Sequence, residues 1–182
     1  DDESHILYSA GDNNELHRIR NINTSAPSAQ DVVDVPVGQI SRVNANAFES
    51  NRLFVGSVTG NVFRVNDADT DTPEVVNISA GITTAGFVSS IDIGSTDDQL
   101  IVTLSNFGIP SVWLTLDGGD TWINKDEVDH GLPDIPVRAA LFNPNNTTEV
   151  LLATELGVWS SDNILADNPG WEPSVNNLAN VR

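Results

Sequence analysis

The residue types best suited to metal chemistry lie in one acidic segment, where Asp67, Asp69 and Asp71 alternate along the chain and Glu74 follows closely. Carboxylate oxygens are the hard ligands that Ca²⁺ prefers in proteins. An EF-hand loop would need a glycine after the third acidic residue, and Thr72 stands there instead. Calcium is therefore the cofactor that the sequence allows, with the three aspartates as ligands. A solvated acidic loop explains the same pattern more simply and is favoured.

Paired carboxylates are the second chemistry to weigh, because glycoside hydrolysis needs two of them across a sugar-binding cleft. The chain has 26 acidic residues, so the pattern alone singles out no pair. Four of these acids are expected near strands: Asp92, Asp117, Asp134 and Glu155.

Sialidase chemistry would need a tyrosine nucleophile and an arginine cluster that binds a carboxylate. The only tyrosine is Tyr8, which lies in an apolar run and is expected to be packed. Arg18, Arg64 and Arg138 follow a repeat in the chain rather than a convergent triad. We therefore favour a chain without a catalytic site. Part of a secreted glycoside hydrolase, with its active centre partly outside this segment, is the alternative.

A turn motif connects these residues to a fold. Thr115, Asp117, Gly119, Thr121 and Trp122 match the Asp-box pattern Ser/Thr-x-Asp-x-Gly-x-Thr-Trp at every fixed position. An Asp carboxylate can accept backbone N–H groups within a turn, and glycine tolerates positive φ at low cost. The tryptophan then anchors the returning strand in an apolar layer. The motif predicts a structural turn between two short strands.

Internal repeats extend this prediction along the chain. Apolar runs begin at residues 6, 53, 100 and 150, so their starts are separated by 47, 47 and 50 residues. Each run is followed by a turn and a second strand, and the later copies are preceded by a third element. The expected second strands are 15–19, 61–65, 111–115 and 157–161, and the expected preceding strands are 40–43, 88–93 and 137–142.

Several short strands per unit at a period near 45 residues are typical of a β-propeller. We predict an all-β protein: a segment of about four four-stranded blades with an Asp-box turn, belonging to a larger propeller. An ordinary β-sandwich with coincidental spacing is the alternative. The predicted repeats are 1–36 (partial), 37–81, 82–131 and 132–177, with residues 178–182 starting a further blade.

The tryptophans follow the same repeat. Trp113 and Trp159 stand at equivalent positions, where Phe63 stands in the preceding copy, which predicts packing between blades rather than an exposed sugar-binding platform. A degenerate copy of the turn motif is expected at Ser160 and Asp162, with Trp171 arriving four residues late.

On these motifs the chain resembles the Asp-box (BNR-repeat) propellers, which include sialidases, sortilin-like receptors and xyloglucanases. The stretch 110–182 is similar to large surface or secreted proteins of Bacteroidetes-type bacteria that are often exported with a C-terminal sorting domain by type IX secretion. The resemblance implies an extracellular propeller and no particular activity.

Composition limits the partners. A net charge of −18 makes binding to nucleic acid or to an anionic membrane through a basic patch unfavourable. The chain has no cysteine, and no apolar run of membrane-spanning length. We therefore expect a secreted or cell-surface module for display, adhesion or scaffolding, with a glycan, a surface protein or the rest of its parent chain as partner.

Overall fold

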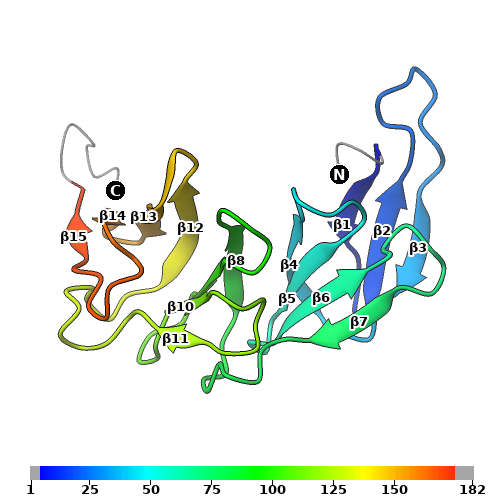
Figure 1. Ribbon diagram of the computed structural model, residues 1–182. Coiled ribbons are helices and arrows are strands. Elements are labelled where there is room, and N and C mark those ends of the chain that lie inside the picture. The colour runs from blue at the N-terminus through cyan, green and yellow to red at the C-terminus, as the bar shows by residue number, and fades with distance from the viewer. Residues whose placement is uncertain (1–4, 175–182) are drawn as a thin grey trace.

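The computed structural model describes residues 5–174, and every regular element in this range is a β-strand. The strands form one three-stranded and three four-stranded antiparallel sheets. The sheets follow one another round an open arc, from the blue sheet at one end to the orange sheet at the other (Figure 1). The chain is thus a segment of a β-propeller, as predicted.

Each sheet is one blade, numbered here in chain order. Blade 1 contains β1 (Leu7–Ala10), β2 (Glu15–Ile19) and β3 (Asp31–Asp34). Blade 2 contains β4 (Ile40–Ala45), β5 (Leu53–Ser57), β6 (Val62–Asn66) and β7 (Glu74–Asn77). Blade 3 contains β8 (Val88–Ile93), β9 (Leu100–Leu104), β10 (Val112–Thr115) and β11 (Ile123–Asn124). Blade 4 contains β12 (Val137–Asn143), β13 (Asn146–Thr154), β14 (Gly157–Ser161) and β15 (Glu172–Pro173).

The inner strands β4, β8 and β12 lie side by side, and each carries a β-bulge near its start. The bulged residues are Ser41, Ser89 and Arg138. The Ser41 hydroxyl donates to the Val88 carbonyl at 2.8 Å, and the Ser89 hydroxyl donates to the Val137 carbonyl at 2.6 Å. In blades 2 and 3 the bulge thus turns a serine side chain toward the next blade, where its hydroxyl joins two neighbouring inner strands.

Apolar side chains are buried in three clusters, one for each interface between consecutive blades. Phe63, Trp113 and Trp159 occupy the same position in blades 2, 3 and 4, and each packs against the preceding blade. This is the role that their spacing predicted. The hydrophobic core therefore consists of three parts, one at each interface. This follows because the sheets of the middle blades are buried on both faces, each against a neighbouring blade.

The outward faces of blades 1 and 4 expose positions that are buried in the middle of the arc. Leu7 is 52% exposed, whereas Leu53, at the equivalent position in blade 2, is 0% exposed. Leu151 in blade 4 is 46% exposed, and its equivalent Ile101 in blade 3 is 0% exposed. Both end faces therefore expose apolar side chains at positions that a neighbouring blade buries in the middle of the arc. The further blade predicted at 178–182 lies outside the described residues.

Alternate connections of an antiparallel sheet emerge at the same end, which places the loops of blade 3. The β9–β10 and β11–β12 connections lie at one end, here called the groove end, and the β8–β9 and β10–β11 connections lie at the other, the turn end. Within residues 5–174, no helix is long and apolar enough to cross a membrane.

Candidate functional site

A groove of about 500 Å³ opens at the groove end of blade 3, between the β9–β10 and β11–β12 connections. Its walls are mostly apolar, and its two charged side chains are both aspartates. The lining residues are Gly108, Ile109, Pro110, Asp126, Val128, Leu132, Pro133 and Asp134. This combination of apolar walls with a few directed polar groups is typical of ligand sites.

Both aspartates are held by backbone N–H groups of the opposite wall. The Ser111 N–H donates to Asp126 Oδ2 at 2.8 Å, and the Gly108 N–H donates to Asp134 Oδ1 at 2.7 Å. Asp126 is partly buried, and Asp134 is exposed. These bonds tie the two connections together and fix the direction of the carboxylates. Each carboxylate keeps further lone pairs for a ligand.

The electrostatics of the groove centre on Asp126. Burial raises its pKa to about 6; the Ser111 N–H bond lowers the pKa, the nearby charge of Asp134 raises it and His130 lowers it slightly. Asp126 is therefore mostly ionised at neutral pH and becomes a protonated donor in mild acid.

Exposed apolar side chains surround the groove. Phe107, which precedes Gly108 in the wall, is 64% exposed, and Val128 is 103% exposed. Phe87 is 41% exposed and lies beside the same connection, because its N–H donates to Asn106 Oδ1 at 2.7 Å. Phe87 and Phe107 are thus exposed on segments at the groove end of blade 3, although neither of them lines the groove itself.

A possible metal cluster lies on the β11–β12 connection. Among the described residues, only Glu127, Asp129 and His130 bring three ligand atoms of this kind within 4.8 Å of one another. The Glu127 N–H donates to His130 Nδ1 at 3.3 Å, so the ring carries its proton on Nε2. Nε2 is also the atom that faces the two carboxylates, 3.9 Å from each. A protonated nitrogen cannot ligate a metal, and the arrangement fits a His–carboxylate contact instead.

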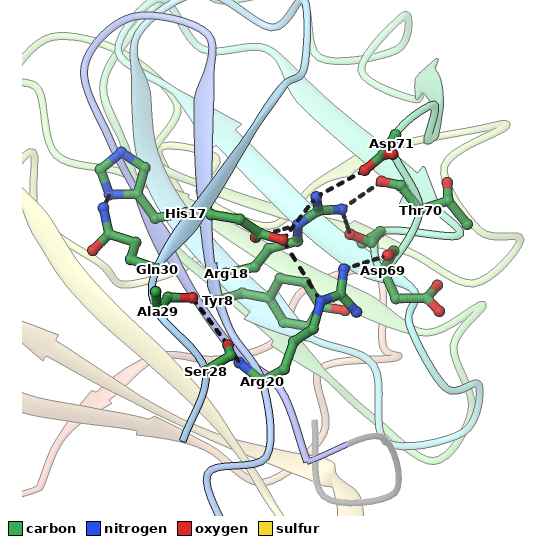
Figure 2. Close-up of polar contacts among 12 residues, drawn as sticks. Tyr8, His17, Arg18, Arg20, Ser28, Ala29, Gln30, Asp69, Thr70 and Asp71 are labelled. Carbon is green, nitrogen blue, oxygen red and sulfur yellow. Dashed lines mark hydrogen bonds and ion pairs between the residues drawn. The ribbon is translucent and has the colours of Figure 1, made fainter. Parts of the chain in front are cut away.

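The acidic loop with Asp67, Asp69 and Asp71 follows β6 and faces blade 1. Figure 2 shows the Arg18 and Arg20 guanidinium groups directed into this loop. Arg18 is 2% exposed, pairs with Asp31 at 2.8 Å and with Asp71 at 3.4 Å, and donates to the Thr70 carbonyl.

The backbone of the loop is bound in the same way. The Ala68 carbonyl accepts from Arg18 at 3.2 Å, and the Asp69 carbonyl accepts from Arg20 at 2.6 Å. Arginines of blade 1 therefore provide the positive charge at this loop, which supports the metal-free interpretation. The calcium site stays a prediction.

The turn at 115–122 lies at the turn end of blade 3, away from the groove. Asp117 Oδ1 accepts from the Thr115 hydroxyl at 2.7 Å and from the Thr121 N–H at 2.9 Å, and the Gly119 N–H donates to Thr115 Oγ1 at 2.9 Å. The Thr121 hydroxyl also donates to Asp117 Oδ2, and this bond is the main cause that lowers the pKa of Asp117 to about 2, followed by the bonds from the Thr121 N–H and the Thr115 hydroxyl. Gly118 and Gly119 have φ of 69° and 99°, which L side chains rarely adopt. The Asp117 carboxylate and the Thr115 hydroxyl thus stabilise the turn itself.

In blade 4 the strand register places the equivalent positions one residue later than the sequence pattern predicted. Thr115 pairs with Leu100 in blade 3, as Ser161 pairs with Val150 in blade 4. The equivalents of Thr115 and Asp117 are therefore Ser161 and Asn163, rather than Ser160 and Asp162. The Asn163 N–H donates to Ser161 Oγ at 3.2 Å, as the Asp117 N–H does to Thr115 Oγ1 at 3.3 Å.

Trp122 and Trp171 make matching contacts across blade interfaces. The Trp122 indole N–H donates to the Ile78 carbonyl of the preceding blade at 2.6 Å. The Trp171 indole N–H donates to the Lys125 carbonyl at 2.7 Å. Both accepting residues directly follow the outer strand of their blade. Each tryptophan thus joins its own blade to the preceding one through the hydrogen bond of its indole N–H.

The other residues considered from the sequence do not gather at one site. Tyr8 packs against the cluster between blades 1 and 2, and its hydroxyl donates to Asn51 Oδ1 at 3.3 Å. Arg138 pairs with Glu155. Asp92 lies at the turn end and accepts from the Phe142 N–H at 2.8 Å, and burial raises its pKa.

Only Asp134 of the predicted carboxylates lines the groove. Asp126 and Phe107 were missed by sequence reasoning, because they belong to no motif. An exposed phenylalanine in a Gly/Pro-containing loop, as in the run Phe107-Gly108-Ile109-Pro110, is the one signal that the sequence offers.

The chain matches no family model, and a search of curated proteins finds no relative. Among solved structures, the GH74 enzyme of Niastella koreensis matches with a TM-score of 0.65 and 17% identity, over 92% of this chain and 28% of that chain. The GH74 xyloglucanase from Xanthomonas campestris matches with a TM-score of 0.66 and 11% identity, over 97% and 29% of the two chains. A chain of the Nup82 NTD–Nup159 TAIL–Nup145N APD complex of Chaetomium thermophilum matches with a TM-score of 0.59 and 13% identity, over 87% and 40%.

The likeness shows the fold. This chain spans less than half the length of each of these three structures, two of which are GH74 enzymes and one of which belongs to a nucleoporin complex. One fold therefore serves unrelated roles, and function has to be argued from the site.

Proposed function

We propose that the protein is a non-catalytic glycan-binding module, a segment of a larger secreted or cell-surface bacterial propeller. The observation that carries this proposal is the groove with two fixed carboxylates, at the end of blade 3 where Phe87 and Phe107 are exposed. The apolar face of a sugar ring stacks on an aromatic side chain, while its hydroxyl groups donate to carboxylates. The blades would act as a rigid scaffold for these loops.

Further parts of the proposal concern the parent protein. Membership of the Asp-box family and export by the type IX route are supported by the motif at 115–122 and by the similarity over 110–182. The exposed faces of blades 1 and 4 support a continuation of the propeller on both sides. The proposal also includes a surface protein as a partner and a calcium ion at Asp67, Asp69 and Asp71.

Glycan binding is tested by affinity electrophoresis of the protein in gels that contain soluble polysaccharides, with xyloglucan included because a GH74 xyloglucanase shares the fold. Retardation by at least one polysaccharide is expected, with a loss of about tenfold in affinity in Phe107→Ala. Phe48→Ala is the matched control, since Phe48 is 53% exposed but lies in the β4–β5 connection at the turn end. Equal retardation of both variants, or no retardation of the protein by any polysaccharide, would refute the proposal.

The second candidate function is a part of a secreted glycoside hydrolase. The specific observation in its favour is Asp126, whose pKa is raised to about 6 beside the charged Asp134, because such an asymmetric pair can supply a general acid and a base. Release of reducing sugar by the protein, abolished in Asp126→Asn, would establish this candidate. Binding without release would leave the module non-catalytic.

A further inference from the structure

We infer that the ligand of the groove is an amine-bearing saccharide, a chain of glucosamine units or a close chemical relative, bound through its ammonium groups by Asp126 and Asp134. This inference rests on the proposed function, since it names the chemical class of the glycan. It follows from the missing basic partners of the two carboxylates, from their fixed orientation and from the apolar walls of the groove.

Both groove carboxylates lack a basic partner among the residues that the structure describes. No ion pair within 4.0 Å joins Asp126 or Asp134 to an arginine, lysine or histidine. Lys125 is next to Asp126 in the chain, yet its ammonium group donates to the Ala166 carbonyl of blade 4 at 2.7 Å. Two unpaired carboxylates in one groove repel each other, and a bound cation removes that repulsion.

The carboxylates are also preorganised for a cation. Each one accepts a single backbone N–H from the opposite wall, so its remaining lone pairs stay free while its orientation is fixed. Asp126 is partly buried, where a charged hydrogen bond is less screened than on the surface. An ammonium group has three donors and suits two carboxylates at once.

The apolar surroundings favour a saccharide over a basic peptide. Pro110, Pro133 and the neighbouring Phe107 offer flat apolar surfaces, on which the C–H face of a pyranose ring can lie. The groove volume of about 500 Å³ is large enough for a few sugar rings. A peptide bound as an added strand would need a long free strand edge, whereas the outer strand β11 has only two residues.

The test compares a glucosamine tetramer with its fully N-acetylated counterpart by isothermal titration calorimetry near pH 7, where Asp126 is mostly ionised. The two sugars share their ring faces and differ in charge. Binding of the amine form at least tenfold more tightly is expected, because one charge-assisted hydrogen bond accounts for about that factor. Asp126→Asn and Asp134→Asn should each bring the two affinities within about threefold, while Phe107→Ala should weaken both sugars alike.

Two controls keep the outcomes distinct. Asp162→Asn removes the same charge from an exposed site at the turn end and should leave the preference unchanged. Urea midpoints of all variants verify that they fold. Equal affinity for both sugars would overturn the amine inference and leave glycan binding intact. No affinity for either sugar or for any polysaccharide would overturn the proposed function as well. Competition by tetralysine with no effect of Phe107→Ala would identify a basic peptide as the ligand and overturn the inference.

Discussion

The substitution Asp126→Asn should stabilise the protein at neutral pH and have little effect in acid. Asp126 has an ordinary pKa of 3.8, which the folded protein raises to about 6. The folded state therefore holds a proton that the unfolded chain releases between these two values. Above about pH 6 the folded state has to ionise a partly buried carboxyl, so the wild-type protein is penalised there, and the penalty disappears below pH 3.8.

The size of this effect follows from the shift. About two pKa units correspond to about 3 kcal/mol for a fully buried group. Solvent screens a partly exposed carboxyl, so an increase of about 1 to 2 kcal/mol in the free energy of unfolding is expected for the variant at pH 7. The asparagine oxygen can still accept from the Ser111 N–H, so the link between the two connections is retained.

Urea unfolding followed by tryptophan fluorescence, at about pH 4 and pH 7, measures this difference between variant and wild type. The difference between variant and wild type is the quantity to compare. The lowered pKa values of Asp31, Asp117 and Glu149 reduce the free energy of unfolding in acid, and they do so equally in both proteins. Asp162→Asn controls for the removal of one charge from a chain with a net charge of −18. An equal gain in this control at pH 7, or a gain in Asp126→Asn that persists at pH 4, would refute the reasoning.

Five further substitutions, two of which serve as comparisons, test the contacts between blades, all by urea unfolding. Trp122→Phe should cost about 1 to 3 kcal/mol, because it leaves the buried Ile78 carbonyl without its donor. Trp159→Phe should be close to neutral, because its buried indole N–H has no partner, and equal costs for the two would contradict this assignment. Arg18→Leu should lower the free energy of unfolding by about 3 kcal/mol, because it removes the buried guanidinium that binds the acidic loop. The same change at the exposed Arg138 should lower it by under about 1 kcal/mol. Gly131→Ala should cost about 1 to 3 kcal/mol, since φ is +92° and a Cβ would lie 2.6 Å from the Trp171 carbonyl oxygen; a neutral result would exclude that close approach.

The architecture was predictable because its signals are local and repeated. The expected strands at 15–19, 88–93 and 157–161 coincide with β2, β8 and β14. Apolar residues that alternate within short runs, separated by Gly and Asn turns, determine strands of this length. The repeat then fixed which strands are equivalent. Where one residue shifted, at Ser161 and Asn163, the sequence pattern was ambiguous because Ser160 offers the same hydroxyl, and only the strand register distinguishes the two.

The groove was not predictable, because its parts are brought together by contacts that leave no mark in the sequence. Asp126 and Asp134 are two among 26 acidic residues, and neither lies in a repeated strand or in the turn motif. Their significance comes from the Ser111 and Gly108 N–H groups on a different connection. Likewise, nothing in the sequence of the acidic loop reveals that Arg18, about 50 residues earlier, supplies its charge. In the groove and in the acidic loop alike, the role of the carboxylates depends on burial and on contacts with residues far away in the sequence.

The division of the core into three clusters, each shared by only two consecutive blades, makes the protein a linear array of nearest-neighbour interactions. Opening one interface does not require the others to open, so amide hydrogen exchange should report separate cooperative units rather than one. The β11–β12 connection of the groove joins blade 3 to blade 4, and Leu132 in the groove wall belongs to the cluster between them. A ligand held there would slow exchange across that one interface and leave blade 1 to exchange at its own rate.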